Sequence, residues 1–162
     1  MVDIPGTYSL FAHSAEEEVA RDFLCFGGAD AAVVVCDATC LERNLNLVLQ
    51  TIEILPRTVV CINLMDEAEK KKIRIDLDKL ENLLGVPVVA ASAREGKGMD
   101  ALMEALESLL CVTSLQPVQL KYPQPVEQAV SHILPETAAF LARIHRSLPP
   151  RWACLLYTSD AA

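Results

Sequence analysis

The sequence has no long hydrophobic run. A helix that spans a bilayer needs roughly 18 or more consecutive apolar residues, whereas the longest apolar runs here, residues 31–36 and 86–91, have the length of strands. The first residues also lack the pattern of a signal peptide, because Asp3 and Pro5 interrupt them at once. We therefore expect these 162 residues to form a soluble segment.

The sequence also lacks a surplus of positive charge. Its 14 lysines and arginines stand against 22 aspartates and glutamates, which gives a formal net charge of -8. A general nucleic-acid binder needs clustered Lys and Arg for its phosphate contacts, so we expect no nucleic acid among the partners. The basic cluster at residues 70–72 is bracketed by Glu67, Glu69 and Asp76, which indicates a solvated loop.

Six cysteines are present, but their placement does not indicate disulfides. Cys36 and Cys61 lie inside or beside Val/Ile runs, where a free thiol acts as a small hydrophobic side chain. Cys36 and Cys40 form a C-x3-C pair, yet no second Cys/His pair follows at the spacing of a zinc site. Buried thiols in a reducing cytoplasm are the favoured interpretation.

Three short apolar runs alternate with segments of helical periodicity. The runs are apolar on both faces, which is typical of a parallel sheet covered by helices on both sides. Alternation of strands and helices at this length predicts right-handed crossovers and a doubly wound α/β sheet. The predicted strands are residues 31–36, 58–62 and 86–91, and the predicted helices are residues 41–55, 77–84 and 99–110.

The pattern changes after Cys111. Residues 113–125 contain three prolines and are expected to form an extended linker. Apolar residues then recur at helical spacing over 126–134 and 136–148, with Pro135 between the two segments. No strand pattern follows, so we expect a small all-helical appendage after the sheet.

Polar residues follow the predicted strands, at the edge where open parallel sheets bind ligands. The first is Asp3, which follows Met1-Val2 and precedes Pro5-Gly6. In nucleotide hydrolases an acid at this place holds Mg²⁺, usually through a water, and the glycine leaves its N–H free to approach a γ-phosphate. Alone the motif is weak, because a strand that ends in a Pro-Gly turn has the same pattern.

Two further polar groups follow the second and third full strands. Asp66 offers a carboxylate that can accept hydrogen bonds from guanine N1–H and the exocyclic amine, a donor pair that adenine lacks. Asn63 would tie neighbouring loops together and contact the base, and Ser92-Ala93 would supply a backbone N–H for guanine O6. The alternative is that Asn63 and Asp66 only cap the segment 67–72.

In their order and placement, the three motifs resemble the third, fourth and fifth signature motifs of the Ras-like GTPase superfamily. The finer resemblance is to the ferrous iron transport protein B family. It rests on residues 3–10 (DIPGTYSL), 14–24 (SAEEEVARDFL), 37–45 (DATCLERNL), 63–68 (NLMDEA) and 92–96 (SAREG). Cys40 departs from the family, in which Asn is expected at that position.

The resemblance continues into the second half of the chain. Tyr122-Pro123, residues 126–130 and Arg151-Trp152 are similar to the helical domain that follows in this family, a domain understood to influence how tightly GDP is held. It implies a partial GTP-binding domain over residues 1–112, the linker over 113–125 and the start of the helical domain over 126–153. Residues 154–162 no longer follow the family, and we expect them to be a non-native tail.

The chain lacks one motif that the resemblance would require. No G-x-x-x-x-G-K-[ST] loop occurs in it, so the residues that cradle the α- and β-phosphates are absent from this sequence. The strand before that loop and the switch I threonine are absent too. We therefore expect a truncated fragment, an α/β P-loop GTPase domain without its N-terminal strand and phosphate loop.

The resemblance also implies ligands and partners. GTP or GDP and Mg²⁺ are the expected cofactors, with Asp3 as the residue toward the metal. The expected partners are the membrane transport domain of the longer protein and Fe²⁺ as its transported ion, which this fragment does not bind. The expected place is the cytoplasmic face of the bacterial inner membrane. The implied nucleotide-binding residues are Asp3, Gly6, Asn63, Asp66, Ser92 and Ala93.

The residue that would catalyse hydrolysis is not assigned. Ras-like enzymes place a water-orienting Gln directly after the D-x-x-G motif, and here that position is Thr7. Hydrolysis is therefore expected to be slow or to use another group. His13 and the acidic residues 16–18 lie within reach in sequence, although a polar switch and the first turn of a helix account for them as well.

Two other functions stay open at this point. The first is another Ras-like GTPase, for example one that assists ribosome assembly or RNA modification, which the acidic charge and residues 37–45 disfavour. The second is an interaction module without a nucleotide, built only from the sheet and the helical appendage. The absence of a phosphate loop makes this second function realistic for the chain as given.

Overall fold

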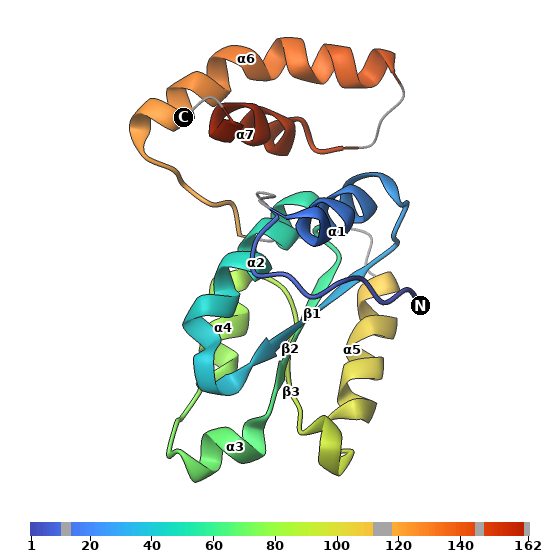
Figure 1. Ribbon diagram of the computed structural model, residues 1–162, viewed down its shortest axis with the longest axis vertical. Coiled ribbons are helices and arrows are strands. Elements are labelled where there is room, and N and C mark those ends of the chain that lie inside the picture. The colour runs from blue at the N-terminus through green and yellow to red at the C-terminus, as the bar shows by residue number, and fades with distance from the viewer. Residues whose placement is uncertain (11–13, 112–117, 145–147, 161–162) are drawn as a thin grey trace. The chain divides into compact units, whose positions relative to one another are not determined.

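The computed structural model describes residues 1–10, 14–111, 118–144 and 148–160 (Figure 1). The chain divides into two compact units: the first unit consists of Met1–Gly28 and Gln119–Ala162, and the second unit of Ala29–Val118. Residues 1–28, which the sequence analysis joined to the GTP-binding domain, thus group with the later helices. In the described part of the chain, no helix has both the length and the apolar character needed to cross a membrane.

The second unit is built on a three-stranded parallel sheet. Strands β1 (Ala32–Asp37), β2 (Thr58–Asn63) and β3 (Val88–Ala90) are hydrogen-bonded in the order β1-β2-β3. The register pairs Asp37 with Asn63, so the strands end together and their following loops meet at one edge of the sheet. The mixed α/β architecture and the strand positions predicted from sequence are confirmed.

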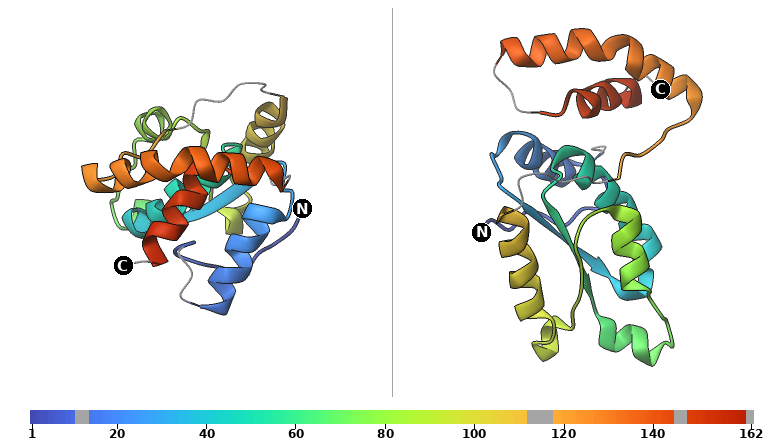
Figure 2. Two further views of the ribbon diagram at one scale, coloured as in Figure 1. Left: turned by 90° about the horizontal axis from the view of Figure 1, so that it is seen from above. Right: turned by 180° about the vertical axis from the view of Figure 1, so that it is seen from behind.

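Helices cover both faces of this sheet. Figures 1 and 2 show α2 (Leu41–Ile54) and α4 (Leu77–Leu84) on one side of it and α5 (Met99–Cys111) on the other. A core cluster, to which Val48, Ile52, Val60 and Ile62 belong, fills the layer against α2 and α4. The central strand β2 is buried along its length, as expected for a strand with neighbours on both sides and helices on both faces.

Strand β1 differs from the expectation of a fully buried strand. Val34 and Cys36 are buried, whereas Val35 is 61% exposed and Val33 lies at 37%. The reason is its position: β1 is an edge strand in the order β1-β2-β3, and only the side chains of one face meet α2. An apolar run cannot reveal which strand of a sheet is at the edge.

Polar capping residues set the ends of α4. The side chain of Asp76 accepts a hydrogen bond from the Lys79 N–H at 2.9 Å, which satisfies one of the free amides of the first turn. At the other end Gly85 adopts a left-handed conformation with φ 68 and donates its N–H to the Glu81 carbonyl. The predicted bounds of residues 77–84 are confirmed.

The first unit is helical. Helix α1 (Ala15–Phe26) begins at Ser14, whose hydroxyl accepts a hydrogen bond from the Glu17 N–H. Helices α6 (Gln124–Arg143) and α7 (Pro150–Asp160) pack against one another. The indole of Trp152 on α7 is buried and lies near the buried thiol of Cys25 on α1, so both ends of the chain contribute to one core. Burial raises the pKa of the Cys25 thiol to about 11.

The predicted break at Pro135 is wrong. Helix α6 is continuous from Gln124 to Arg143 and contains Pro135 in its interior. A proline there removes one backbone hydrogen bond to the carbonyl four residues earlier, that of Ser131. Both Pro135 and Ser131 are exposed, so water can satisfy that carbonyl. The Thr137 hydroxyl also donates to the Ile133 carbonyl at 3.0 Å, a bond that links residues on either side of Pro135.

An ion pair between Glu127 on α6 and Arg151 on α7 also binds the segment before α6. The Arg151 guanidinium donates to both carboxylate oxygens of Glu127 at 2.8 and 3.0 Å, and to the Leu120 carbonyl at 2.9 Å. The Tyr122 N–H also donates to Glu127, and its ring lies 5.8 Å from the guanidinium. These bonds hold the pKa of Glu127 at about 2 and explain why residues 120–122 are ordered without regular structure.

The expected non-native tail begins with two buried side chains. Cys154 is 1% and Leu155 is 3% exposed, and the Cys154 thiol lies 3.5 Å from the Thr137 hydroxyl. These residues belong to α7, which continues through Asp160. Cys154 thus meets α6 through Thr137, and helical spacing places Leu155 on the same face of α7 as Trp152. The sequence analysis did not predict this packing.

Candidate nucleotide-binding site

Two loops at the carboxyl end of the sheet are joined through Asn63. Its side-chain carbonyl, at the end of β2, accepts a hydrogen bond from the Ala93 N–H at 3.0 Å. Ala93 begins the short turn η2 (Ala93–Glu95) that follows β3. The predicted tie between neighbouring loops is therefore present, and it uses the same N–H that the sequence analysis assigned to guanine O6.

Asp66 is held beside the same loop. It lies in the first turn of α3 (Met65–Lys70), which Leu64 connects to β2 through a left-handed backbone conformation with φ 63. The Asp66 N–H donates to the buried Ser92 hydroxyl at 3.2 Å, and the Met65 N–H donates to the Ala91 carbonyl at 3.2 Å. These bonds fix the Asp66 backbone against the loop after β3.

A close turn gives this loop its shape. Ser92 and Lys97 exchange backbone hydrogen bonds at 3.0 and 3.3 Å, which closes the segment between them. Gly96 and Gly98 lie within or next to it with φ of 70 and 82, a region that favours glycine. A Cβ on Gly98 would overlap the Ala90 carbonyl, so this close approach requires a glycine.

The carboxylate of Asp66 is paired with a guanidinium. Arg94 Nη2 lies 2.9 Å from Asp66 Oδ2 and 3.5 Å from Glu67 Oε1, and the Lys70 ammonium lies 2.9 Å from the same Glu67 oxygen. Partial burial raises the pKa of Asp66, but Arg94 and Lys70 outweigh it and hold that pKa below its ordinary value. Asp66 is thus an ionised carboxylate at neutral pH, and its oxygens can accept hydrogen bonds but not donate them.

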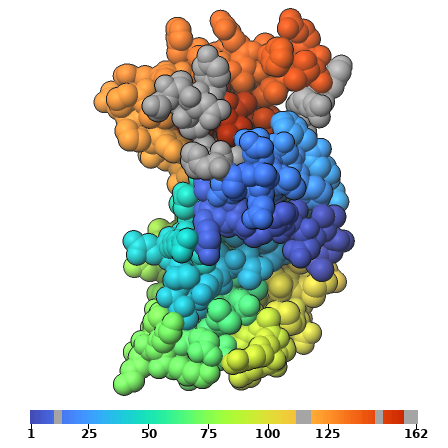
Figure 3. Space-filling model, in the orientation of Figure 1, coloured from blue at the N-terminus to red at the C-terminus, as the bar shows by residue number. Residues whose placement is uncertain are grey.

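A cavity of about 790 Å³ opens beside this pair. Its volume falls in the range of small-molecule sites. In the space-filling view, the green segment of α3 and the yellow segment that leads into α5 adjoin on the surface at this place (Figure 3). The lining residues are Met65, Asp66, Glu69, Lys70, Ile73, Arg74, Ile75, Ser92, Glu95 and Lys97.

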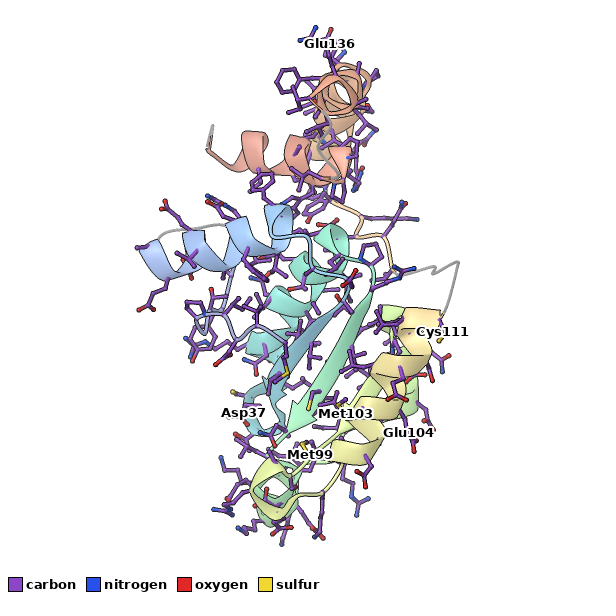
Figure 4. The ribbon with its side chains drawn as sticks, turned by 90° about the vertical axis from the view of Figure 1, so that its right-hand side faces the viewer. Asp37, Met99, Met103, Glu104, Cys111 and Glu136 are labelled. Atoms are coloured by element: carbon purple, nitrogen blue, oxygen red, sulfur yellow. The ribbon has the colours of Figure 1, made fainter. Side chains whose placement is uncertain are left out.

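The first strand ends in a capped turn at the same edge. Figure 4 shows Asp37 and Met99 toward this end of the sheet. The Asp37 carboxylate accepts from the Thr39 N–H at 2.7 Å, and its own N–H donates to the Asn44 side chain at 2.6 Å. Residues 37–45, which carried much of the resemblance to the family, thus have a structural role: they turn the chain from β1 into α2.

Asp3 and Gly6 lie in the first unit, within an exposed segment that has no regular structure. A Cβ on Gly6 would meet no atom within 4 Å. The neighbouring Thr7 hydroxyl donates to the Ser9 carbonyl at 2.7 Å, accepts from the Ser9 N–H and lies 3.3 Å from Glu17. His13, named in the sequence analysis, lies outside the described residues.

The structure brings four of the six predicted residues together: Asn63, Asp66, Ser92 and Ala93. Sequence reasoning quoted Arg94 within the motif that follows β3 but gave it no role, although it is the partner of Asp66. One sequence feature could have indicated this pairing. A positively charged residue directly follows Ser92-Ala93, in a loop that must approach the Asn-x-x-Asp segment. Among the described residues, no group of three or more His, Cys, Asp or Glu is arranged to hold a metal ion.

Comparison with known proteins places this geometry in a family. The sequence model described as "Ferrous iron transport protein B" matches residues 1–106. The Fe(2+) transporter FeoB of Salmonella typhimurium is 42% identical over 111 residues, which cover 66% of this chain and 14% of that protein. The chain therefore spans about a seventh of the length of this relative.

Solved structures agree with the sequence comparison. The cytosolic domain of the T. maritima FeoB iron transporter, in a GDP form, has a TM-score of 0.85 and 34% identity, covering 98% of this chain and 61% of that one. Its GMPPNP form has a TM-score of 0.85 and 32% identity, covering 98% of this chain and 62% of that one. With the match over residues 1–106, these findings show that the chain belongs to the ferrous iron transport protein B family.

Proposed function

We propose that the chain supplies the guanine-recognising part of a GTP-binding and GTP-hydrolysing domain that regulates a ferrous iron membrane transporter. The observation that carries the proposal is the cluster of Asn63, Asp66, Ser92 and Ala93 at the carboxyl end of the sheet, with its ionised carboxylate. The GDP and GMPPNP forms of the T. maritima relative support a guanine nucleotide as the ligand.

The four residues fit a guanine base chemically. Asp66 would accept from N1–H and the exocyclic amine, while the Ser92 hydroxyl and Asn63 hold the Asp66 backbone and the Ala93 loop in place. Because the Ala93 N–H already donates to Asn63, guanine O6 would share this donor or replace Asn63 as its acceptor. Adenine would face Asp66 with an acceptor at N1, which an ionised carboxylate repels.

Asp3 fits Mg²⁺ only as one ligand among several. Mg²⁺ is usually bound by one or two carboxylates together with phosphate oxygens and waters, and Asp3 is an exposed carboxylate with room around it. When bound, the ion would neutralise charge on the phosphates of the nucleotide. Gly6 would bring its N–H to the same phosphates, since no neighbouring atom obstructs the approach.

Thr7 is unsuited to orient an attacking water. Its hydroxyl proton is used in the bond to the Ser9 carbonyl, and its oxygen accepts from the Ser9 N–H. We therefore expect slow hydrolysis in the longer protein. There the nucleotide state would act on a membrane transport domain that carries Fe²⁺, at the cytoplasmic face of the inner membrane, because GTPase switches are ordered by the γ-phosphate and released after hydrolysis.

Base selectivity tests the proposal directly. Guanosine monophosphate is added to the ¹⁵N-labelled chain at millimolar concentration, and amide shifts of Asp66, Ser92 and Ala93 are followed by NMR, with adenosine monophosphate as the matched control. We expect saturable shifts at these three amides with the guanine nucleotide only. Equal responses to both bases, or none at these amides, would favour an interaction module without a nucleotide.

A further inference from the structure

We infer that Arg94 occupies the guanine-reading carboxylate of Asp66 in the absence of nucleotide and must be displaced by the base, so that it limits guanine affinity. This inference rests on the proposed function, since it concerns the same site. It assigns to Arg94 a role as an internal competitor, which is distinct from the base-reading roles of Asp66 and Ala93.

The chemistry of the two donors supports competition. Guanine presents N1–H and its exocyclic amine on a planar N–C–N unit, and an arginine presents the same kind of unit in its guanidinium. Both are suited to a carboxylate, which accepts such paired donors in its own plane. Arg94 Nη2 already lies at a full hydrogen-bond distance, 2.9 Å, from Asp66 Oδ2.

Exposure explains why the two donors compete for the same edge. The Asp66 side chain is only 12% exposed, so little of its carboxylate is open to a ligand. The guanidinium of Arg94, a side chain that is 71% exposed, lies against the Oδ2 atom of that carboxylate. A base that reaches Asp66 must therefore move the guanidinium, and a side chain this exposed can move without disturbing the core.

Glu67 provides the displaced guanidinium with a second partner. Its Oε1 atom lies 3.5 Å from Arg94 Nη2, against 2.9 Å for Asp66 Oδ2. A small rotation of Arg94 toward Glu67 would free Asp66 while keeping the positive charge paired. Lys70, which lies 2.9 Å from the same Glu67 oxygen, shares this acceptor and keeps the displaced state from being strongly favoured.

The magnitude of the effect follows from the exposure of the pair. Exposed ion pairs are weak, so removing Arg94 should tighten guanosine monophosphate binding by about two- to fivefold rather than by orders of magnitude. The difference should narrow at high ionic strength, because salt screens an exposed pair. A substitution elsewhere in the second unit that removes one positive charge away from Asp66 and the cavity should leave the affinity unchanged.

The experiment compares the full 162-residue chain with Arg94→Ala and with Lys79→Ala as the matched control. Lys79 lies on α4, is exposed and does not line the cavity beside Asp66. Dissociation constants for guanosine monophosphate and adenosine monophosphate are taken from amide shifts at low and high salt. The Arg94 side-chain N–H signals, recorded before and after nucleotide addition, report the displacement itself.

Tighter guanine binding by Arg94→Ala, no change with Lys79→Ala, and a shift of the Arg94 side-chain signal that saturates with the nucleotide would support the inference. If the parent chain prefers guanine but Arg94→Ala binds it equally or more weakly, the inference is wrong and the proposed function stands. If neither version prefers guanine over adenine, the proposed function fails and the inference fails with it.

Discussion

At the scale of single residues, the proposed choice of base depends on Asp66. Asp66→Asn replaces one acceptor oxygen by a donor, so it should weaken binding of guanosine monophosphate and favour xanthosine monophosphate, whose C2 oxygen accepts where guanine donates. Two hydrogen bonds to a charged group, at about 1.5–3 kcal/mol each, set the upper scale of the loss. NMR titration with both nucleotides measures the reversal; an unchanged guanine affinity would show that Asp66 serves only as a helix cap.

Glu127 gives a second prediction at this scale, one of pH-dependent stability. Its pKa is about 2 in the folded chain against an ordinary 4.5. A group with a lowered folded pKa contributes stability above its unfolded pKa and loses it as the pH falls toward the folded value. Glu127→Gln should therefore lower the free energy of unfolding at pH 7, and this deficit should shrink between about pH 4.5 and 2.

Urea unfolding, followed by the fluorescence of Trp152, measures this effect in the right part of the molecule. Trp152 is the single tryptophan of the chain and lies one residue from Arg151, the partner of Glu127. Glu136→Gln on the exposed side of α6 is the matched control. A deficit that is equal at pH 7 and pH 3 would mean that the ion pair with Arg151 is not its source.

The positions of individual site residues could be predicted from sequence where the backbone alone determines them. Asn63 and Asp66 follow a buried strand, so the end of a parallel sheet positions them before any side-chain contact is known. The pairing of Asp66 with Arg94 could not be predicted, because it depends on how the loop from Ser92 to Lys97 folds back on itself. The glycines at positions 96 and 98 permit such a turn, but the backbone hydrogen bonds between Ser92 and Lys97 that close it have no sequence pattern of their own.

At the scale of elements, the loop after β3 depends on Gly98. Gly98→Ala would place a Cβ against the Ala90 carbonyl and the Ala91 Cα, on a backbone with φ 82. Gly96→Ala is the matched control, since its φ is 70 but nothing obstructs the added methyl group. The control should cost about 1–2 kcal/mol for its left-handed backbone, whereas Gly98→Ala should cost more and shift the Ser92 and Ala93 amides.

Thermal melts and amide spectra of the two variants separate these effects. Both variants bear the conformational cost, so only the difference between them reports the close approach to β3. If Gly96→Ala and Gly98→Ala lower the melting temperature equally and leave the Ser92 amide unchanged, the loop relaxes away from Ala90 and its shape does not depend on that glycine.

Helix α7 gives a further prediction at this scale. Leu155 is 3% exposed within the core of the first unit, so Leu155→Ala should lower the free energy of unfolding by about 2–4 kcal/mol, as is usual for a buried leucine. Leu156→Ala, one residue further on and only partly buried, should cost clearly less. Urea unfolding followed by Trp152 fluorescence measures both, and equal small effects would show that this segment is not packed.

The elements themselves were predictable to different degrees. Residues 58–62 and 77–84 were placed within one residue, because buried β-branched runs and a capped amphipathic helix leave strong patterns. The continuity of α6 through Pro135 could not be predicted. A proline on the exposed side of a helix removes only one backbone hydrogen bond, and water can replace it. The burial of Leu155 depends on tertiary packing within the first unit, a feature with no local signal.

At the scale of the whole chain, the proposed base-recognising residues occur without a phosphate loop in this sequence. Asn63, Asp66, Ser92 and Ala93 lie in the second unit, and the sequence contains no G-x-x-x-x-G-K-[ST] loop. The boundary predicted at residue 112 follows the family's domain order, whereas residues 1–28 pack with the later helices through contacts such as Cys25 with Trp152. Sequence order alone does not specify which segments share a core.

The absence of a phosphate loop from this sequence predicts that the chain binds GDP or GTP almost as weakly as guanosine monophosphate. A phosphate loop supplies backbone N–H groups and a lysine to the most highly charged part of the ligand, and such charge-assisted bonds are the strong ones. Without them, the base contacts must offset the lost translational and rotational freedom, at least about 4 kcal/mol. Fluorescent GDP and GTP are titrated against the chain and against a version preceded by the phosphate-loop segment of a relative, with the loop lysine replaced as the control. We expect a large, Mg²⁺-dependent gain only in the extended version with its lysine intact; submicromolar, Mg²⁺-dependent binding by the unextended chain would show that its own residues already hold the phosphates.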